Sequence, residues 1–143
     1  KIYLDTCCYC RPFDESEQEK ISKERNVIGA ILDLSPIMDY TIVGSLALRT
    51  EIDEISDTEK HQAVSNFYKS AVNEYIPLTD TIIEHGRIMS ATAGLGGFDG
   101  LHLAFAESAG ADYLLTVDNQ FEKASSKLNL KVKVINPLKF WGA

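Results

Sequence analysis

Two short apolar runs of the sequence each end in an aspartate that is followed by residues typical of helix starts. The runs are Ile2–Thr6, which contains Asp5, and Tyr113–Asp118. Runs of this kind, with β-branched or aromatic members, are typical of strands buried in a parallel sheet. In open α/β sheets, ligands bind at the carboxyl ends of such strands. We therefore expect Asp5 and Asp118 to form part of an acidic cluster, which suits a hard divalent cation.

Two further acidic residues occupy unusual positions. Glu51 lies on a helical stripe with Leu48 and Ile55, where a carboxylate is costly to bury unless it is paired or bound to metal. Asp99 follows a glycine-rich loop and starts a small, apolar helix. Each acid also has a simpler interpretation, because aspartates commonly cap helices and a glutamate can face solvent or pair with a lysine. Together, however, the four acids predict a metal site.

The elements that would position these acids alternate between strand and helix along the chain. Strands are predicted at 2–6, 40–43, 75–78, 113–118 and 131–135, and the last is an edge-strand candidate because its lysines alternate. Helices are predicted after the capping boxes Ser16–Glu19 and Ser56–Glu59, and at 45–55, 79–89, 99–109 and 121–127. This alternation predicts an α/β fold, a three-layer α/β/α sandwich with a central parallel sheet.

Length and composition limit the class of protein. A chain of 143 residues is expected to form one domain over 1–143. The net charge of −7 argues against sequence-blind nucleic-acid binding through a broad basic face. No apolar run approaches the roughly 18 residues that span a bilayer. Three cysteines between positions 7 and 10 are too close in sequence to cross-link a fold, so we expect a reducing cytoplasm.

At the positions of the four acids the chain resembles the PIN-domain nucleases. The matching segments are Ile2-Tyr3-Leu4-Asp5-Thr6, Ser45-Leu46-Ala47-Leu48-Arg49-Thr50-Glu51-Ile52, Asp99-Gly100-Leu101-His102-Leu103-Ala104 and Gly110-Ala111-Asp112-Tyr113-Leu114-Leu115-Thr116-Val117-Asp118. The resemblance implies a PIN-like fold in which Asp5, Glu51, Asp99 and Asp118 hold one or two Mg²⁺ or Mn²⁺ ions. It also implies supporting roles for Thr6 and Thr116 beside the ligands.

The same resemblance implies a function. It predicts a metal-dependent endoribonuclease of the kind found as the toxin of toxin–antitoxin pairs, with RNA as substrate, a small antitoxin as partner, and a homodimer as the assembly. Bound metal would activate water and stabilise charge on the phosphate. Arg11, after the first strand, and Lys123, after the last aspartate, are candidate phosphate contacts.

Three alternatives remain open at this point. A catalytically degenerate PIN-like domain would bind RNA or a protein without cleaving. The C-x-x-C formed by Cys7 and Cys10 resembles a thiol oxidoreductase site with Cys7 as nucleophile, although Cys8 and Cys10 also suit packing behind the first strand. His102, one turn after Asp99, either packs in the core or orients that aspartate and binds phosphate.

Overall fold

The computed structural model describes residues 1–142, whose centre is a five-stranded parallel sheet in the order β3-β2-β1-β4-β5. The strands are β1 (Ile2–Leu4), β2 (Ile42–Ser45), β3 (Glu74–Ile76), β4 (Tyr113–Leu115) and β5 (Lys133–Ile135). Tyr3 of β1 pairs in register with Val43 on one side and Leu114 on the other. The residues of β1 are all buried, as expected for a central parallel strand.

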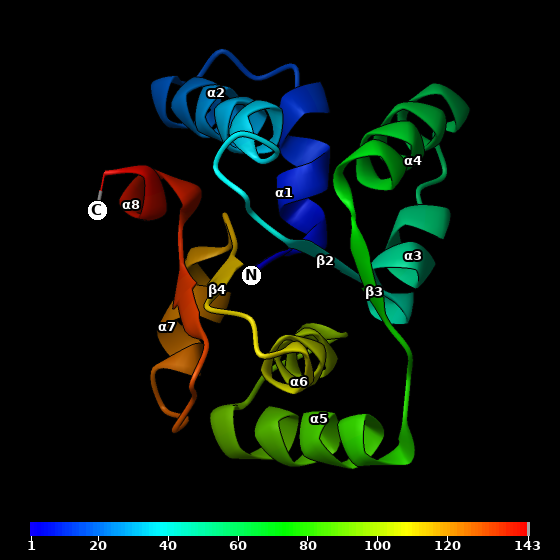
Figure 1. The fold of residues 1–143 in the computed structure, drawn as a ribbon, viewed down its shortest axis with the longest axis vertical. Helices are drawn as coiled ribbons and strands as arrows, with labels where there is room; N and C mark the ends of the chain where they lie inside the picture. Colours follow the sequence, from blue (N-terminus) through cyan, green and yellow to red (C-terminus); the bar gives the residue numbers. More distant parts are fainter. Residues whose placement is uncertain (143) are drawn as a thin grey trace.

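Helices cover both faces of this sheet, which confirms the predicted three-layer α/β/α sandwich. They are α1 (Thr6–Cys10), α2 (Glu19–Leu34), α3 (Leu46–Asp53), α4 (Thr58–Ala71), α5 (Asp80–Ala93), α6 (Asp99–Ala109), α7 (Asn119–Ser125) and α8 (Pro137–Trp141), with a 3₁₀ turn at Arg11–Phe13. Figure 1 shows α1, α2 and α8 on one side of the sheet and α6, backed by α5, on the other. Across residues 1–142, no helix combines the length and apolarity needed to cross a membrane.

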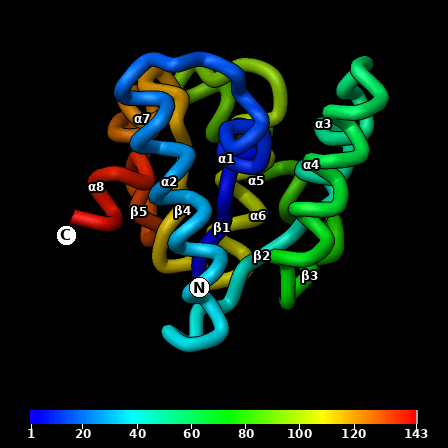
Figure 2. The backbone as a smooth tube through the Cα atoms, turned by 90° about the horizontal axis from the view of Figure 1, so that it is seen from above, coloured from blue at the N-terminus to red at the C-terminus, as the bar shows by residue number. Residues whose placement is uncertain are grey.

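The strand order places a topological switch point at the first aspartate. The chain runs outward from β1 through β2 to β3, and then returns to add β4 and β5 on the other side of β1. In Figure 2 the chain rises from the N-terminus through β1 into α1, and α7 lies at that same end of the sheet. Crevices for ligands in open parallel sheets form at such points, outside the carboxyl ends of the strands. Asp5 follows β1 and Asp118 follows β4 within three residues.

Helix α6 lies unusually close to its neighbour α5. A Cβ atom built on Gly100 would lie 2.0 Å from the Oγ of Ser90 and 2.5 Å from the carbonyl oxygen of Gly86, so only glycine fits there. Leu103 and Phe105 of the same helix are fully buried. The small, apolar character predicted for this helix therefore reflects tight packing, which fixes Asp99 in its first turn.

The local predictions need several corrections. Ser16 does not cap α2: its hydroxyl accepts from the amide of Gln18, and Arg25 donates to the carbonyl oxygens of Asp14 and Ser16, which holds this segment as a loop. Helix α2 begins only at Glu19.

Most other boundaries differ from the prediction by one to four residues, and two of these differences have a visible cause. Asp57, and not Ser56, caps α4, because its side chain accepts from the amide of Lys60. Strand β2 lies at 42–45 and not at 40–43, because Gly44 and Ser45 pair with β3. The edge position predicted for the last strand is confirmed by β5. The short helices α1 and α8 were not predicted, since neither spans enough residues for a helical period.

Candidate metal centre

Asp5 is held by hydrogen bonds at both carboxylate oxygens. Its Oδ1 accepts from the amide of Thr6 at 2.8 Å, so Asp5 caps the short helix α1. Its Oδ2 accepts from the hydroxyl of Thr116 at 2.9 Å and from the thiol of Cys7 at 3.3 Å. With 6% of its surface exposed, Asp5 is a buried carboxylate without a lysine or arginine partner among the described ion pairs. Such a group needs another source of positive charge.

Glu51 lies close to Asp5 and is anchored at one oxygen. Its Oε1 accepts from the hydroxyl of Thr6 at 2.7 Å and from Nε2 of His102. Burial opposes ionisation of Glu51, but the hydrogen bond and charge of His102, with the hydroxyl of Thr6, hold its pKa below the usual value. Thr6 thus contacts Asp5 through its amide and Glu51 through its hydroxyl, which ties the two carboxylates together.

His102 lies in the core, as one of its two interpretations predicted, but it also contacts the carboxylates. It is fully buried, with Nδ1 2.6 Å from the hydroxyl of Tyr3 and Nε2 3.6 Å from Oδ1 of Asp5. Burial lowers its pKa, but the hydrogen bond to Glu51 and the nearby carboxylates outweigh burial and raise it. One ligand atom from each of Asp5, Glu51 and His102 lies within 4.8 Å of the others. The available signal was its spacing of three residues from Asp99, which puts both on one helix face.

Asp99 and Asp118 lie beside this cluster and share a pocket. The pocket has a volume of about 150 Å³ and is lined by Gly94, Leu95, Gly96, Asp99, Asp118, Gln120, Phe121 and Ala124. Burial and the charges of Asp5, Asp118 and Glu51 raise the pKa of Asp99 to about 6, against the opposing effect of His102. Asp118 caps α7 through Oδ1, which accepts from the amides of Gln120 and Phe121. The cap therefore uses only one of its two oxygens.

The helix-cap interpretation is thus correct for Asp118 and wrong for Asp99. Phe98 is the residue before α6, and Asp99 is already within the helix. The carboxylate of Asp99 therefore does not cap α6, and Asp99 lines the shared pocket. Its position in the first turn favours negative charge through the helix dipole, yet its pKa is still raised. Burial, together with the surrounding carboxylates, therefore outweighs the helix dipole.

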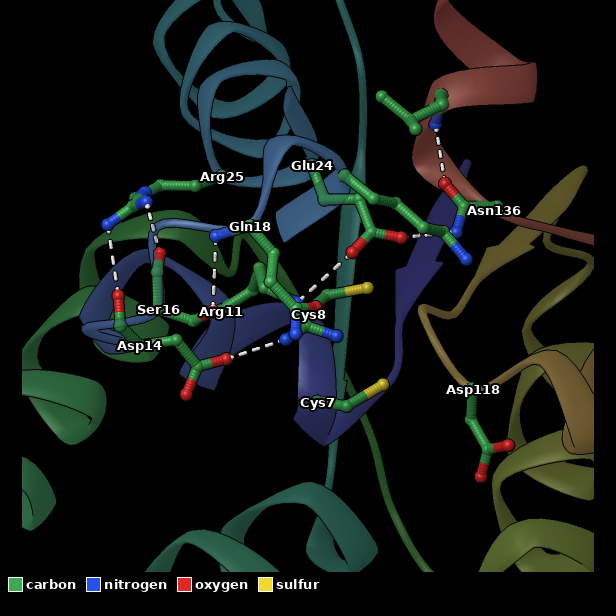
Figure 3. Close-up of polar contacts among 12 residues, drawn as sticks. Cys7, Cys8, Arg11, Asp14, Ser16, Gln18, Glu24, Arg25, Asp118 and Asn136 are labelled. Atoms are coloured by element: carbon green, nitrogen blue, oxygen red, sulfur yellow. Dashed lines mark hydrogen bonds and ion pairs between the residues drawn. The ribbon is translucent and has the colours of Figure 1, made fainter. Parts of the chain in front are cut away.

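The two predicted phosphate contacts have different environments. Arg11 donates from Nη1 to Oδ2 of Asp14 at 2.8 Å and places Nε 3.3 Å from Oε1 of Glu24. Figure 3 shows the Arg11 guanidinium among these carboxylates, with Asp118 on the far side of Cys7. The buried Glu24 also accepts from Asn136 at 2.6 Å, which joins α2 to the start of α8. Lys123 is exposed on α7. These contacts give Arg11 a structural role, because they join the 3₁₀ turn that contains it to Asp14 and to Glu24 of α2.

Cys8 and Cys10 have the environments of packed side chains. All three are free thiols. Burial raises the pKa of Cys8 far above its usual value, and its thiol donates to the carbonyl oxygen of Leu115 at 3.2 Å. Burial also raises the pKa of Cys10. Reactive cysteines need a lowered pKa to form the thiolate, so neither Cys8 nor Cys10 has the environment of an activated nucleophile.

A comparison with known protein families identifies the family to which this chain belongs. The family description "PIN domain" matches residues 2–127. The chain belongs to the PIN-domain family. No curated protein matches the sequence at a significant level.

Three solved structures share the fold over nearly the whole chain. VapBC2 from Rickettsia felis, bound to a DNA fragment from its promoter, has 20% identity and a TM-score of 0.64, and the match covers 94% of this chain and 98% of that one. FitAcB from Neisseria gonorrhoeae has 17% identity, a TM-score of 0.61 and coverages of 96% and 99%. VapC20 of Mycobacterium tuberculosis, a sarcin-ricin loop cleaving toxin, has 14% identity, a TM-score of 0.65 and coverages of 93% and 99%.

The residues of this PIN domain fit a divalent cation. Carboxylate oxygens are the hard ligands that Mg²⁺ and Mn²⁺ prefer; Asp5 and Glu51 lie in the compact group with His102, and Asp99 and Asp118 line the pocket beside it. Among the described ion pairs, His102 is the only basic side chain that contacts any of the four. Burial raises the pKa of Asp99, and this excess of negative charge raises it further.

Proposed function

We propose that this PIN domain is an endoribonuclease that depends on Mg²⁺ or Mn²⁺. Asp5, Glu51, Asp99 and Asp118 would hold one or two ions. The observation that supports the proposal is the grouping of these carboxylates at the switch point of the sheet, where burial and the charges of the other three raise the pKa of Asp99 to about 6. A cluster that destabilises its own ionised form in this way is suited to a cation.

The chemistry proposed is hydrolysis of a phosphodiester bond. The oxygen of water bonds to phosphorus, the bond from phosphorus to the 3′ oxygen breaks, and that oxygen takes a proton, which leaves a 5′-phosphate and a 3′-hydroxyl. A bound divalent ion would lower the pKa of the water and offset charge on the phosphate. Thr6 and Thr116 orient Asp5 by donating to both of its oxygens. Thr6 also holds Glu51 in the same arrangement.

The solved structures support the choice of RNA and of partners. VapC20 is a toxin that cleaves the sarcin-ricin loop, which is an RNA, and VapBC2 and FitAcB carry the names of two-component complexes. We propose by analogy that this chain is the toxin of a toxin–antitoxin pair, with a small antitoxin as partner, and that it acts in the cytoplasm as a homodimer. These assignments rest on likeness of fold, and the metal centre is the part supported by the residues themselves.

Cleavage of labelled RNA tests the enzymatic proposal directly. Purified protein is incubated with a pool of end-labelled RNA in Mn²⁺, in Mg²⁺ and in EDTA. We expect cleavage only with metal, and we expect Asp5→Asn to lose orders of magnitude in rate, because the metal ligands act as a unit. Asp112→Asn is the matched control, since Asp112 is an exposed aspartate at the opposite end of β4.

The outcomes separate three interpretations. Cleavage that survives both EDTA and Asp5→Asn would indicate a contaminating nuclease and contradict the mechanism. Absence of cleavage of any RNA, together with measurable Mn²⁺ binding, would favour the catalytically degenerate binding module. Analysis of the product ends checks the chemistry. Breaking the bond from phosphorus to the 3′ oxygen leaves a phosphate at the 5′ end of the downstream fragment and a hydroxyl at the 3′ end of the upstream one.

A further inference from the structure

A continuous series of hydrogen bonds connects the start of α3 to a carboxylate on that same helix. The amide of Leu48 donates to Oγ of Ser45 at 3.2 Å, which caps α3. Oγ of Ser45 lies 2.7 Å from the hydroxyl of Tyr3, and this hydroxyl lies 2.6 Å from Nδ1 of His102. Nε2 of His102 then contacts Oε1 of Glu51. The series starts on α3, crosses β1 and α6, and returns to α3.

When the ring of His102 is neutral, the chemistry of the groups gives the series one direction. A carboxylate oxygen only accepts, so Nε2 of His102 carries the hydrogen in its bond to Glu51. Nδ1 of the neutral ring is then an acceptor, and the hydroxyl of Tyr3 donates to it. The oxygen of Tyr3 in turn accepts from Ser45, whose own oxygen accepts from Leu48. Every donor has an acceptor, and bonds aligned in this way strengthen one another.

Water cannot substitute for the three middle members of the series. Tyr3, Ser45 and His102 are each 0% exposed. The rings of Tyr3 and His102 also pack edge to face, with their centroids 5.6 Å apart. Removing one hydroxyl would therefore leave a buried partner unsatisfied.

The end of the series is less enclosed than its middle. The side chain of Glu51 is 30% exposed, so its position depends on the groups that hold Oε1. Those groups are His102 and the hydroxyl of Thr6, which already donates to it from the start of α1. The second oxygen, Oε2, lies outside both bonds and keeps its lone pairs for another partner.

We propose that Tyr3 and His102 are positioning residues that hold Glu51 in the orientation needed to bind the metal ion. The inference rests on the proposed metal-dependent function. Because His102 and Asp99 lie three residues apart on α6, the same bonds also fix α6, and hence Asp99, relative to α3. Neither residue needs to touch the substrate. Their role is to set the relative position of two carboxylates that come from different helices.

Two tyrosines of the same burial make a matched test. Tyr3→Phe removes the hydroxyl from the series and keeps the ring. Tyr9→Phe is the control, because Tyr9 is also 0% exposed and, within residues 1–142, its hydroxyl has no hydrogen-bond partner. Mn²⁺ affinity is measured by calorimetric titration, and folding is checked by circular dichroism. We expect Tyr3→Phe to raise the Kd for Mn²⁺ about tenfold, as loss of a residue that orients a ligand typically does, and Tyr9→Phe to leave it unchanged.

A second pair of variants keeps the proposal testable if Tyr3→Phe folds poorly. His102→Gln retains an N–H donor near the position of Nε2, whereas His102→Leu retains only bulk. We expect His102→Gln to bind Mn²⁺ more tightly than His102→Leu, which a purely structural role for the ring would not produce. Equal Kd values for the parent and Tyr3→Phe, or for the two His102 variants, would overturn the inference and leave the proposed function intact. A folded parent that binds no Mn²⁺ would contradict the proposed function, and the inference with it.

Discussion

At the scale of single residues, the ionised carboxylate of Asp99 is the costliest charge at the site. Burial and the charges of Asp5, Asp118 and Glu51 oppose it, and a pKa of about 6 means that it ionises near neutral pH only at a cost. His102 offsets part of that cost, but no arginine or lysine among the described ion pairs does so. The metal-free protein should therefore gain stability when this charge is removed.

Asp99→Asn tests this residue-scale prediction. A pKa raised from 3.8 to about 6 corresponds to about 3 kcal/mol, and screening at this half-buried group reduces the effect to roughly 1 kcal/mol. The folded state binds more protons than the unfolded state between these pH values, so the parent loses stability as the pH rises from 4 to 6. We expect the Tm of Asp99→Asn to exceed that of the parent by about 4 °C at pH 7 and to match it near pH 4.

The same variant should respond weakly to metal. Differential scanning calorimetry with Mn²⁺ is expected to raise the Tm of the parent by mass action and to raise that of Asp99→Asn much less. Equal gains in Tm for the two proteins would contradict the assignment of Asp99 as a ligand. A metal-free Asp99→Asn protein that is less stable than the parent at pH 7 would contradict the electrostatic argument.

At the scale of elements, the site depends on how α6 packs between α5 and the sheet. This helix carries both Asp99 and His102, so its position determines the distance of each from Asp5 and Glu51. The packing has no room for a side chain at Gly100. A change at this glycine, which is not itself a ligand, should therefore reach the site by moving the whole helix.

Gly100→Ala is the corresponding prediction. The added Cβ would meet Oγ of Ser90 and the carbonyl oxygen of Gly86, so overpacking should cost about 1–3 kcal/mol and weaken Mn²⁺ binding. Gly29→Ala is the control, because Gly29 lies inside α2 with nothing within 4 Å of an added Cβ. That change should stabilise the protein by about 0.5–1 kcal/mol and leave metal affinity unchanged. Urea unfolding and calorimetric titration measure both effects, and unchanged Mn²⁺ affinity in folded Gly100→Ala would refute the coupling.

The elements also explain which features could be predicted from the sequence. Buried strands such as 113–115 can be predicted because strands inside a parallel sheet are apolar runs. The candidate ligands Asp5, Glu51, Asp99 and Asp118 could be identified because their carboxylates interrupt apolar patterns. The start of α2 could not be predicted, because the Arg25 bonds that hold residues 14–16 join side chain to backbone across 9 and 11 positions. The role of His102 was equally hidden, since its partners Tyr3 and Glu51 lie 99 and 51 residues away.

At the scale of the whole molecule, an acidic protein is proposed to act on an anionic substrate. The net charge of −7 includes the carboxylates of the site. The molecule therefore repels RNA until a divalent cation offsets the local charge. Fold and charge together make the cation the central requirement of the proposed activity, ahead of any partner or sequence preference.

A crystal structure determined after soaking in Mn²⁺ tests that requirement most directly, because manganese is located by its anomalous scattering independently of any activity. The proposed function predicts an anomalous peak at the carboxyl edge of β1 and β4, in contact with the carboxylate of Asp5 and with oxygens of Glu51, Asp99 or Asp118. The same soak of Asp5→Asn should lose the peak, while Asp112→Asn should keep it. A parent crystal with no peak at this edge, or with manganese bound only elsewhere, would contradict the metal centre and the activity proposed for it.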